Sequence, residues 1–542
     1  MMTKSAIVDH PIRSVATLPV DTQLAQTLLD SVAKYSEKLQ GRRIWLACSG
    51  GRDSLALAAL CSQLYQQGQL PFLPQLLHID HGLQASSYLW ARHVAKWAAA
   101  QHMPCHILSV QVEGDDEQAA RQARYKAMRA HINREDVILL AHHADDQAET
   151  ILMRLIQGAG VKGLSGMQPW REQLQENQLT ILWRPWLSVR RRHISAYAKQ
   201  LKLPYIDDPT NTSGDNVRSG LRRDVIPVLA TYNPNVIDNI ARSAQLLTDA
   251  QATVDAQSMH DLQETVIAPL CYPAAQRVID INRLKKLPPY RQRQLLHFWL
   301  ALDEPLPPSK QLIDDSMRLT ERQDHNHQTQ LRWHAQGQSY TIRRYREQLY
   351  RVSQEWLSWL ALPLIEPTAI DIQNMSGTTA LSAELSVGLD TGMTTVTLPL
   401  RSNAAFDWQI KIDIERISAL LKSQGGSSAT KIQLQIIPLD RQQKVYTTLA
   451  HLPLAGKKLY QVLGIPVWLR DSLVVFSLVH TSGIDREPSL TMSTPIMLLS
   501  PVNKWILKSD KKQVILTNRQ GNDVLDNVLN EAFSNNFISK TH

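Results

Sequence analysis

Hydrophobic and polar residues alternate in regular blocks over the first third of the chain. Short apolar runs predict buried strands, and each is followed by a stretch with the apolar spacing of a helix. Such alternation predicts an α/β fold, a parallel sheet with helices on both faces, whose ligands bind at the carboxyl ends of the strands. The expected strands are 44–48, 73–80, 105–110 and 137–141. The expected helices are 21–39, one that follows Ser54 and runs to about 67, 86–101, 117–132 and 145–156.

The alternation stops near residue 230, which predicts a change of domain. A long helix is expected over 235–262, a basic helix with a tryptophan over 291–302, and strand character over 339–352. A segment rich in Thr, Ser, Ala, Gly and Pro with little charge is typical of a linker. The expected organisation is a flexible lead-in (1–20), a catalytic domain (21–230), an α-rich middle domain (231–361), a linker (362–395), a small α+β C-terminal domain (396–485) and a polar tail (486–542).

Composition narrows the class of protein only modestly. The chain has 542 residues, 43% of them hydrophobic, and a net charge of +8, which permits a polyanionic partner without requiring one. Its four cysteines are scattered without a C-x-x-C pair, which indicates a reducing compartment and argues against a zinc or iron–sulfur site. The N-terminus lacks the apolar core of a signal peptide, and no apolar run has membrane-spanning length. A cytoplasmic protein without membrane contact is therefore expected.

The first candidate site lies in Ile44 to Leu57, where an apolar strand is followed by a glycine turn and a helix. Glycines allow backbone N–H groups to approach a phosphate, and the helix N-terminus adds unsatisfied donors. Asp53 can cap this helix or help to hold a Mg²⁺ ion. The pattern is not a Walker A motif, and a plain capped turn is the alternative. The residues of this phosphate-binding loop are Ser49, Gly50, Gly51, Arg52, Asp53 and Ser54.

Three further polar clusters follow the later strands. H-I-D-H-G-L carries Asp80 and His81 at a strand end, where an adenine or ribose would lie. Arg121 and Arg124 follow Glu117 at helical spacing, although a solvated ion-pair stripe explains that spacing equally well. In A-H-H-A-D-D-Q-A-E-T, two histidines and three acids crowd a strand-to-helix junction, either as helix caps or as ligands for an ammonium group and Mg²⁺. The members of this third cluster are His142, His143, Asp145, Asp146 and Glu149.

Together these motifs resemble those of the tRNA(Ile)-lysidine synthetases, PP-loop enzymes of the N-type ATP pyrophosphatase superfamily. S-G-G-R-D-S alone indicates only the superfamily, whereas the block from His142 to Met167 narrows the resemblance to this family. The similarity continues through R-P-W-L, Y-I-D-D-P-T-N and R-S-G-L-R. Ser219 stands where the family usually has Asn, and Gln84 replaces the common Arg after D-H-G-L.

The resemblance implies that ATP and Mg²⁺ serve to join L-lysine to C2 of the wobble cytidine of a CAU-anticodon tRNA(Ile). An adenylated cytidine forms with release of pyrophosphate, and lysine then displaces AMP, changing the specificity from Met to Ile. Asp53, His143, Asp146 and Glu149 are the implied catalytic residues, and Asp53 is the candidate Mg²⁺ ligand. The loop residues Ser49 to Ser54, with Asp80 and His81, would bind ATP. Lysine or cytidine would be bound by Arg121, Arg124, Asp146, Glu149, Asn211, Arg218 and Arg222.

The C-terminal half would bind tRNA. Arginines interleaved with tyrosines over 339–352 suit RNA phosphates and stacking, although a polar-faced surface strand is the alternative. K-K-L-Y-Q-V-L-G-I-P-V-W-L-R-D resembles a block of the long-type family members. A homodimer is compatible with the sequence. The candidate tRNA-binding residues are Arg343, Arg344, Arg346, Lys457, Lys458 and Arg470.

Three other functions are considered. A tRNA thiolase needs sulfur-carrying cysteines, whereas Cys48 and Cys105 lie in predicted strands. An amidotransferase or ligase acting on a small metabolite needs an ammonia source and leaves the C-terminal half unexplained. A nucleotide sensor that binds RNA without chemistry does not need the acids and histidines around the loop.

Overall fold

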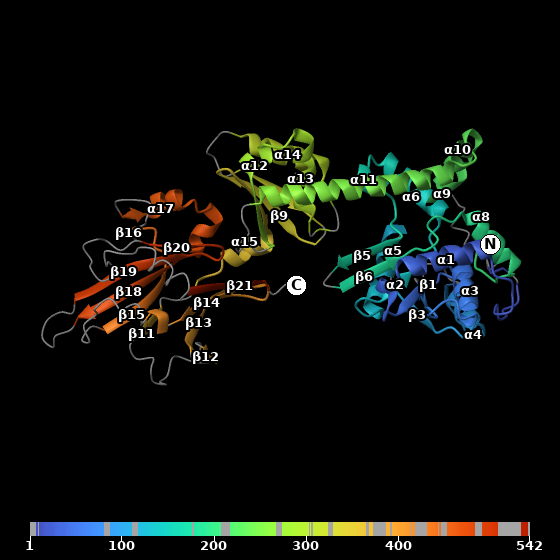
Figure 1. Ribbon diagram of the computed structural model, residues 1–542, viewed down its shortest axis with the longest axis horizontal. Coiled ribbons are helices and arrows are strands. Elements are labelled where there is room, and N and C mark those ends of the chain that lie inside the picture. Colours follow the sequence, from blue (N-terminus) through green and yellow to red (C-terminus); the bar gives the residue numbers. More distant parts are fainter. Residues whose placement is uncertain are drawn as a thin grey trace. The chain divides into compact units, whose positions relative to one another are not determined.

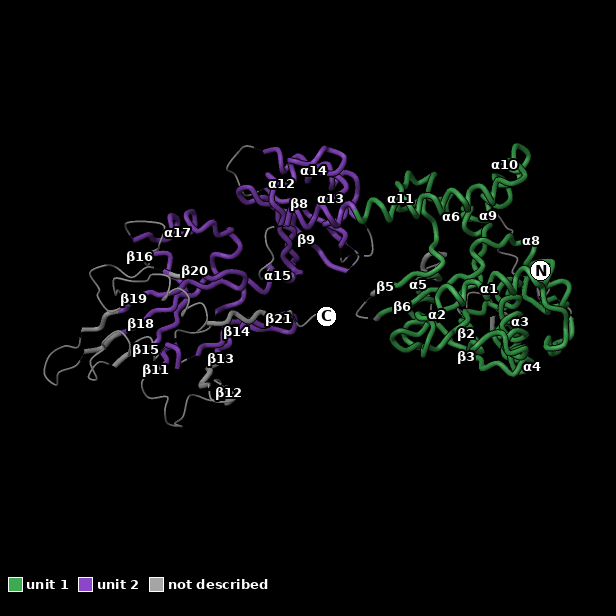
Figure 2. Tube along the Cα trace, viewed as in Figure 1, with its two compact units in different colours: residues 1–256 green, residues 257–542 purple. Residues whose placement is uncertain are grey.

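The computed structural model of the chain separates into two compact units, Met1–Ala256 and Gln257–His542, which are described one at a time (Figure 2). The structure describes residues 7–8, 10–80, 87–110, 117–175, 178–207, 217–266, 274–302, 304, 307–322, 329–335, 337–364, 368–371, 386–390, 393–413, 415–417, 431–442, 444–445, 453–482, 490–507 and 533–539. The two units divide after Ala256, within the helix Val236–Thr265, whereas the domain boundary was expected at 230.

Unit 1 contains one six-stranded sheet in the order β3-β2-β1-β4-β6-β5 (Figure 1). Neighbouring strands are parallel, which confirms the predicted parallel sheet, except that β5 pairs antiparallel with β6 at one edge. This edge hairpin was not predicted from the pattern. The strands are β1 (Ile44–Ala47), β2 (Gln75–Asp80), β3 (Cys105–Ser109), β4 (Val137–Leu139), β5 (Trp170–Gln175) and β6 (Gln178–Trp183).

The five helices predicted before residue 157 are present close to their expected positions, with the expected helix over 21–39 broken at Tyr35 into α1 and α2, whereas α7, α8, α9, η2 and α10 were not predicted. Asp21 caps α1 by accepting a hydrogen bond from the backbone N–H of Leu24 (2.9 Å). The helices are α1 (Thr22–Lys34), α2 (Ser36–Leu39), α3 (Arg52–Gln66), α4 (Ser87–Ala100), α5 (Glu117–His131), α6 (Ala144–Ile156), α7 (Val161–Leu164), α8 (Arg191–Gln200), α9 (Val217–Gly220), the π-helix η2 (Leu221–Val225), α10 (Ile226–Tyr232) and α11 (Val236–Thr265).

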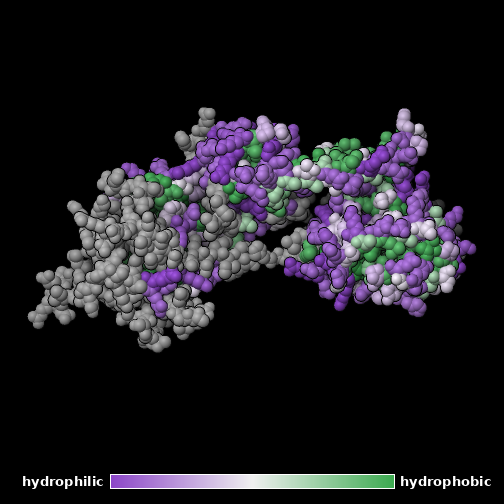
Figure 3. Space-filling view, in the orientation of Figure 1, coloured by the Kyte–Doolittle hydropathy of each residue, from purple (hydrophilic) through white to green (hydrophobic). Residues whose placement is uncertain are grey.

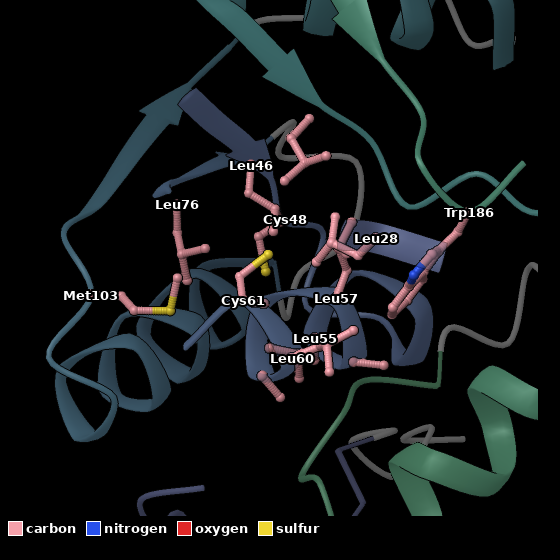
Figure 4. Packing of buried hydrophobic residues seen from close by; sticks show 14 of the residues in the cluster. Leu28, Leu46, Cys48, Leu55, Leu57, Leu60, Cys61, Leu76, Met103 and Trp186 are labelled. Carbon is pink, nitrogen blue, oxygen red and sulfur yellow. The ribbon is translucent and has the colours of Figure 1, made fainter. Parts of the chain in front are cut away.

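The central strand β1 is buried on both faces, because successive side chains point to opposite sides of a strand. Ile44 and Leu46 join a core with helices α1, α3, α4 and α8, whereas Trp45 joins a second core with helix α5. Figure 4 shows side chains of β1, β2 and α3 meeting in the first core. Helix α3 is buried without a break from Ser54 to Leu64. The loop before α3 is therefore held on a rigid support.

The described residues of the expected lead-in, 7–8 and 10–20, are packed against the rest of unit 1 rather than flexible. Val15 is buried, and its N–H donates to the side-chain oxygen of Gln101 (2.9 Å). The amide of Gln63 in α3 donates to the carbonyls of Val15 and Leu18 (2.9 Å each). Because these contacts are far apart in sequence, polar composition alone did not indicate them.

Unit 2 contains three larger sheets of antiparallel strands and a small two-stranded one, in the orders β7-β10-β9-β8, β11-β15-β18-β19-β20, β12-β13-β14-β21 and β16-β17. The expected strand region 339–352 is in fact the hairpin β9–β10, since Arg346 and Glu347 turn the chain back. The helices are α12 (Ile281–Lys285), α13 (Pro289–Ala301), α14 (Lys310–Glu321), α15 (Gln354–Leu360), α17 (Gly456–Leu463) and the 3-10 helix η3 (Val467–Ser472). The strands are β7 (Gln276–Asp280), β8 (Gln330–His334), β9 (Ser339–Tyr345), β10 (Gln348–Ser353), β11 (Thr368–Asp371), β12 (Ser386–Asp390), β13 (Met393–Ser402), β14 (Phe406–Asp413), β15 (Lys431–Pro438), β16 (Lys444–Val445), β17 (Leu454–Ala455), β18 (Val474–Ser482), β19 (Leu490–Leu499), β20 (Lys504–Ile506) and β21 (Phe533–Ser539).

The segments expected to be a linker and a tail contribute strands to these sheets. Strands β11 and β12 lie in the linker range and pair with β15 and β13. Strands β19, β20 and β21 lie in the tail range, and β21 pairs with β14. The low charge of the first segment and the polar composition of the second do not predict strands, because these strands are stabilised by pairing with partners distant in sequence.

One hydrophobic core joins the expected middle and C-terminal domains. Trp356 and Trp359 of α15 stack on each other and contact Phe406 of β14. The buried guanidinium of Arg401 in β13 donates to the carbonyl of Leu360 (3.0 Å) and to the hydroxyl of Ser472 (2.7 Å). The described part of unit 2 therefore packs as one body.

Hydrophilic residues cover much of the described surface on the face shown in Figure 3. Within the described ranges, no helix combines the length and apolar character needed to cross a membrane.

Candidate active site

The phosphate-binding loop lies between the end of β1 and the start of α3. Gly50 has φ +82°, and a Cβ there would lie 2.6 Å from Cδ1 of Ile206 and 2.8 Å from Cγ2 of Val94. The Ile206 N–H donates to the Gly50 carbonyl (2.9 Å), so the loop is fastened to the segment after α8. Gly51 is the N-cap of α3, and the Ser49 hydroxyl accepts from its N–H (3.2 Å). This places backbone donors and a helix N-terminus at the strand end, as predicted.

The two charged loop residues have different partners. Arg52 lies over the ring of Tyr205 (4.7 Å), and its guanidinium donates to the Ser195 hydroxyl (3.1 Å). Asp53 Oδ2 lies 3.6 Å from His143 Nε2 and 3.8 Å from Arg191 Nε. Burial would raise the pKa of Asp53, but His143, Arg191 and Arg52 outweigh burial and lower it. Asp53 is therefore a carboxylate at neutral pH.

His143 begins helix α6 in a capping box. The Asp146 N–H donates to His143 Nδ1 (3.2 Å), and the His143 N–H donates to Asp146 Oδ2 (3.1 Å). In its neutral form the ring therefore carries its proton on Nε2, toward Asp53. Burial lowers the pKa of His143, but Asp146, Asp53 and Asp145 outweigh it and raise the pKa overall. His143 is thus a basic imidazole within an acidic cluster.

His142 lies in the opposite environment. Arg184 Nε donates to His142 Nδ1 (3.1 Å), so the proton of the neutral ring is on Nε2. Burial and the charges of Arg184, Arg121 and Arg218 hold the pKa of His142 well below its ordinary value. His142 is therefore a neutral hydrogen-bond donor at Nε2, and of the two histidines His143 is the better proton acceptor.

Glu149 is buried in α6 and pairs with Arg222 of the π-helix η2. Its two oxygens accept from Arg222 Nε (2.7 Å) and Nη2 (2.9 Å). One turn away, Arg218 Nη2 donates to the Thr150 hydroxyl (3.2 Å). Glu149, Asp146 and Asp53 all raise the pKa of Arg222, although its burial lowers it. The structure thus brings Arg218 and Arg222 onto α6, with the carboxylate of Glu149 already paired, and binding of lysine or cytidine by these residues stays a prediction.

The donor set fits a Mg²⁺ ion that also binds the phosphates of ATP. Asp53 Oδ1 is buried and has no hydrogen-bonding partner among the described residues, so one hard oxygen is available beside the loop. Within the described ranges no group of three or more His, Cys, Asp or Glu side chains could hold a metal by itself. Mg²⁺ characteristically takes only one or two carboxylates and completes its shell with phosphates and water.

Of the remaining predicted binding residues, three are described and two lie outside the described part of the chain. Asp80 ends β2, beside the strand that leads into the loop, and is partly buried. Arg121 lies over the Tyr125 ring (5.1 Å), and Arg124 is on the same helix, α5. His81 and Asn211 lie outside the described residues, and so does Gln84, whereas Ser219 is described and buried.

The candidate tRNA-binding arginines of the hairpin β9–β10 have internal contacts. Arg343 lies over the Trp468 ring (5.3 Å). Arg344 donates to the carbonyls of Thr320 (3.1 Å) and Arg322 at the end of α14. A guanidinium in this position stabilises the C-terminus of the helix. Arg346 is exposed. Contact with tRNA stays a prediction for all three arginines, and Arg346 is the best placed.

The other candidate tRNA-binding residues lie around helix α17. Lys457 and Lys458 are exposed in its first turn. Arg470 lies over the Tyr460 ring (5.2 Å), and its Nε donates to the Ile465 carbonyl (3.3 Å).

Three arginines of the site were not assigned a role from the sequence. Arg191 contacts Asp53, and its N–H donates to Asp145 Oδ2 (2.8 Å). Arg190 Nη1 pairs with Asp238 of α11 (2.8 Å). Arg184 fixes the tautomer of His142. For Arg190 and Arg191 the run V-R-R-R-H at the start of α8 was the available signal, because adjacent arginines favour nearby anionic partners.

The described cysteines do not suit sulfur transfer. Cys48, Cys61 and Cys105 are free thiols. Burial raises the pKa of Cys48 to about 11 and those of Cys61 and Cys105 to about 12. Because the thiolate is the reactive form, these side chains are inert at neutral pH.

Comparisons with known proteins identify the families that two segments of the chain match. Residues 21–229 match the family model described as a PP-loop domain, and residues 279–350 match the model described as a TilS substrate binding domain. The tRNA(Ile)-lysidine synthase of Psychrobacter sp. (strain PRwf-1) is 37% identical over 90% of this chain and 95% of its own length. That of Vibrio vulnificus (strain CMCP6) is 30% identical over 79% of this chain and 87% of its own.

Among solved structures, an NH3-dependent NAD synthetase from Campylobacter jejuni is 16% identical and covers 42% of this chain and 94% of its own, at a TM-score of 0.25, too low to add to the argument. The two relatives, in contrast, align over nearly their full lengths. The chain belongs to the tRNA(Ile)-lysidine synthase family of enzymes.

Proposed function

We propose that the protein joins L-lysine to C2 of the wobble cytidine of a CAU-anticodon tRNA(Ile), with ATP converted to AMP and pyrophosphate. The observation that carries this proposal is the position of the phosphate-binding loop against helix α6, where Asp53 lies 3.6 Å from His143. Family membership supports the substrates, and the inert thiols of the three described cysteines argue against a thiolase.

In the first step the cytidine O2 attacks the α-phosphorus of ATP, and pyrophosphate leaves. The N–H groups of the loop at Gly50 and Gly51 and the N-terminus of α3 stabilise negative charge on the phosphates. When bound at Asp53, Mg²⁺ would add a Lewis acid that neutralises charge on the leaving pyrophosphate. Arg52 and Arg191 add fixed positive charge beside the loop.

In the second step the lysine ε-amine attacks C2, the C2–O2 bond breaks, and AMP leaves with O2. The amine must lose a proton, because its ordinary pKa is about 10.4. His143 is the proposed acceptor, since neighbouring carboxylates raise its pKa. To accept this proton, His143 Nδ1 would release the Asp146 N–H, and Asp145 Oδ2, 3.9 Å from Nδ1, would stabilise the added charge. His142, a neutral donor, suits a hydrogen bond to the cytidine.

Nucleoside mass spectrometry tests the activity. A CAU-anticodon tRNA(Ile) transcript is incubated with the protein, ATP, Mg²⁺ and lysine, and a parallel reaction omits lysine. A cytidine heavier by one condensed lysine, present only in the complete reaction, is the expected product. Pyrophosphate release without this product would indicate a different acceptor, and no use of ATP would favour a nucleotide sensor.

Asp146→Asn tests the assignment of the lysine site. Asparagine keeps an oxygen for the His143 N–H and so preserves the capping box, while the negative charge is lost. We expect lysine-dependent turnover to fall by about a hundredfold or more, a loss typical of a general acid–base or charge contribution, with ATP affinity nearly unchanged. Calorimetric titration with a non-hydrolysable ATP analogue is the control measurement. Loss of nucleotide binding would contradict the assignment.

A further inference from the structure

A cavity of about 370 Å³ lies in unit 2, away from the phosphate-binding loop in the sequence. One side is formed by the end of β7 and the turn of the hairpin β9–β10, and the other by the end of α17 and the turn between β19 and β20. The cavity therefore depends on the core shared by the two halves of unit 2. Its lining includes Asp280, Tyr345, Arg346, Gln348, Asn503 and Trp505.

Arg346 is held in a conformation that favours glycine. Its φ is +53°, which the first position of a two-residue hairpin turn requires and which costs free energy for a residue with a Cβ. Its guanidinium lies 5.8 Å from the Tyr345 ring, and a Cβ on Gly464 would lie 3.0 Å from its Nη1. Apart from this ring contact, the guanidinium has no hydrogen bond or ion pair among the described residues. The turn thus presents an available cation at the cavity.

The rest of the lining combines aromatic and polar groups. Tyr345 and Tyr350 are buried beside the cavity, and Trp505 is partly exposed in it. Within the described residues, the Asp280 carboxylate accepts a hydrogen bond from the N–H of Arg283 (2.9 Å), and the side chain of Asn503 is exposed. Of the three rings only Trp505 is accessible enough to stack on a flat heterocycle, and carboxylate and amide oxygens suit the amino groups of such a ligand. The carboxylates of Asp280 and of Glu347, which also lines the cavity, disfavour a small anion alone, and the polar edge disfavours an apolar ligand.

We propose that this cavity binds one unpaired nucleotide of the tRNA, with an amino-bearing base, cytosine or adenine, inside it and the phosphate on Arg346. This inference rests on the proposed function, because it takes tRNA as the substrate. It is supported by the match of residues 279–350 to a substrate-binding family model, since that segment supplies Asp280 and the whole hairpin turn. Base stacking with a cationic rim is a common way to hold single-stranded RNA.

Two substitutions at Arg346 provide the first test. Arg346→Gln removes the charge, and Arg346→Gly also relieves the strain of a positive φ, so it is expected to fold at least as stably as the wild type. Both should raise KM for tRNA about fivefold or more, with KM for ATP and lysine unchanged, and lower the slope of log affinity against log salt by about one. Arg293→Gln, an exposed arginine of α13, is the charge-matched control. If both Arg346 variants behave like this control, the proposed nucleotide site is wrong. Lysidine formation at the wild-type rate in those variants would leave the proposed function standing.

A photo-crosslinking amino acid at position 503 provides the second test. We expect crosslinks to one unpaired cytidine or adenosine of the bound tRNA. Crosslinks confined to base-paired nucleotides, or none, would overturn the proposal. Competition, compared between the wild type and Arg346→Gln, identifies the source of the nucleotide: CMP or AMP, but not UMP, should weaken tRNA binding to the wild type and should have a smaller effect on the variant. If CMP binds without affecting tRNA affinity, the cavity takes free nucleotides and the tRNA proposal fails.

Discussion

At the scale of residues, two adjacent histidines have opposite proton affinities. His143 is surrounded by carboxylates, which raise its pKa, whereas burial and three arginines lower the pKa of His142. The peptide between them places one side chain toward the acids and the other toward Arg184. The protonation state of a histidine therefore depends on the charges and burial around it and not on its residue type alone.

His142→Gln should make stability less sensitive to acid. The pKa of His142 is lower in the folded chain than its unfolded value near 6.5, so the unfolded chain binds the extra proton as the pH falls through 6.5. The native histidine therefore costs stability below that pH and none above it. Urea unfolding between pH 5 and 8, monitored on both proteins, checks this. A variant whose stability falls as steeply with acid as the wild type would contradict the assignment.

Gly50→Ala should damage the loop through crowding as well as backbone strain. At φ +82° an added Cβ costs about 1–2 kcal/mol, and it would also displace Ile206 and Val94. Gly68→Ala is the matched control, because its φ is +71° but nothing lies within 4 Å of the added Cβ. Unfolding free energies should fall more for Gly50→Ala, and only that variant should lose ATP affinity. Equal losses of unfolding free energy in the two variants would mean that Ile206 and Val94 move away from the added Cβ at no cost, and would contradict the prediction.

At the scale of elements, the π-helix η2 supplies a partner for a carboxylate on α6. Arg222 lies 73 positions after Glu149, and the pair is bidentate. Such π-helical turns are uncommon and occur often at functional sites. The widened turn of Leu221–Val225 carries the guanidinium to a glutamate that has almost no access to water.

Removing Arg222 should cost more than removing the pair. Arg222→Met leaves the buried carboxylate of Glu149 unpaired, which should destabilise unit 1 by about 3 kcal/mol. The double variant with Glu149→Gln should recover much of that loss, because no buried charge remains. A double-mutant cycle by urea denaturation measures the coupling between the two residues. Additive losses would show that the pair contributes little in the folded protein.

At the scale of the molecule, unit 2 is held together by contacts between its two halves. Trp468 of η3 lies edge-on to the ring of Tyr350 (5.0 Å), and its N–H donates to Gln276 Oε1 (2.9 Å). With Arg401 bound to Leu360, this makes the expected middle and C-terminal domains one packed body. A truncation between them would expose the buried surface of Trp356 and Trp359.

Trp468→Ala should therefore destabilise unit 2 by about 3 kcal/mol without changing ATP binding by unit 1. Val467→Ala is the control, because Val467 is the exposed neighbour in the same helix. Differential scanning calorimetry should show one transition lowered in the tryptophan variant and both transitions unchanged in the control. A lowered ATP affinity, measured by calorimetric titration, would indicate that the two units fold together.

The pattern of residues predicted the parallel sheet and the loop because both depend on short segments. The apolar run at Ile44, the glycines of the loop and the acids of α6 are local features, and the structure has the elements within a few residues of their expected ends. The edge hairpin β5–β6 and the strands of the expected linker were not predicted. Their sequences are polar or mixed, and their stability comes from pairing with strands far along the chain.

The sequence by itself determined the fold of unit 1, the position of the phosphate-binding loop and the residue types of the site. The tertiary structure decided how those residues are paired: Glu149 with Arg222, Asp53 with His143 and Arg191, and His142 with Arg184. Helical and strand periodicities are set within a few residues, whereas an ion pair depends on where the topology brings two distant segments together. The protonation states of the site residues depend on those partners, so they are determined only in the folded chain.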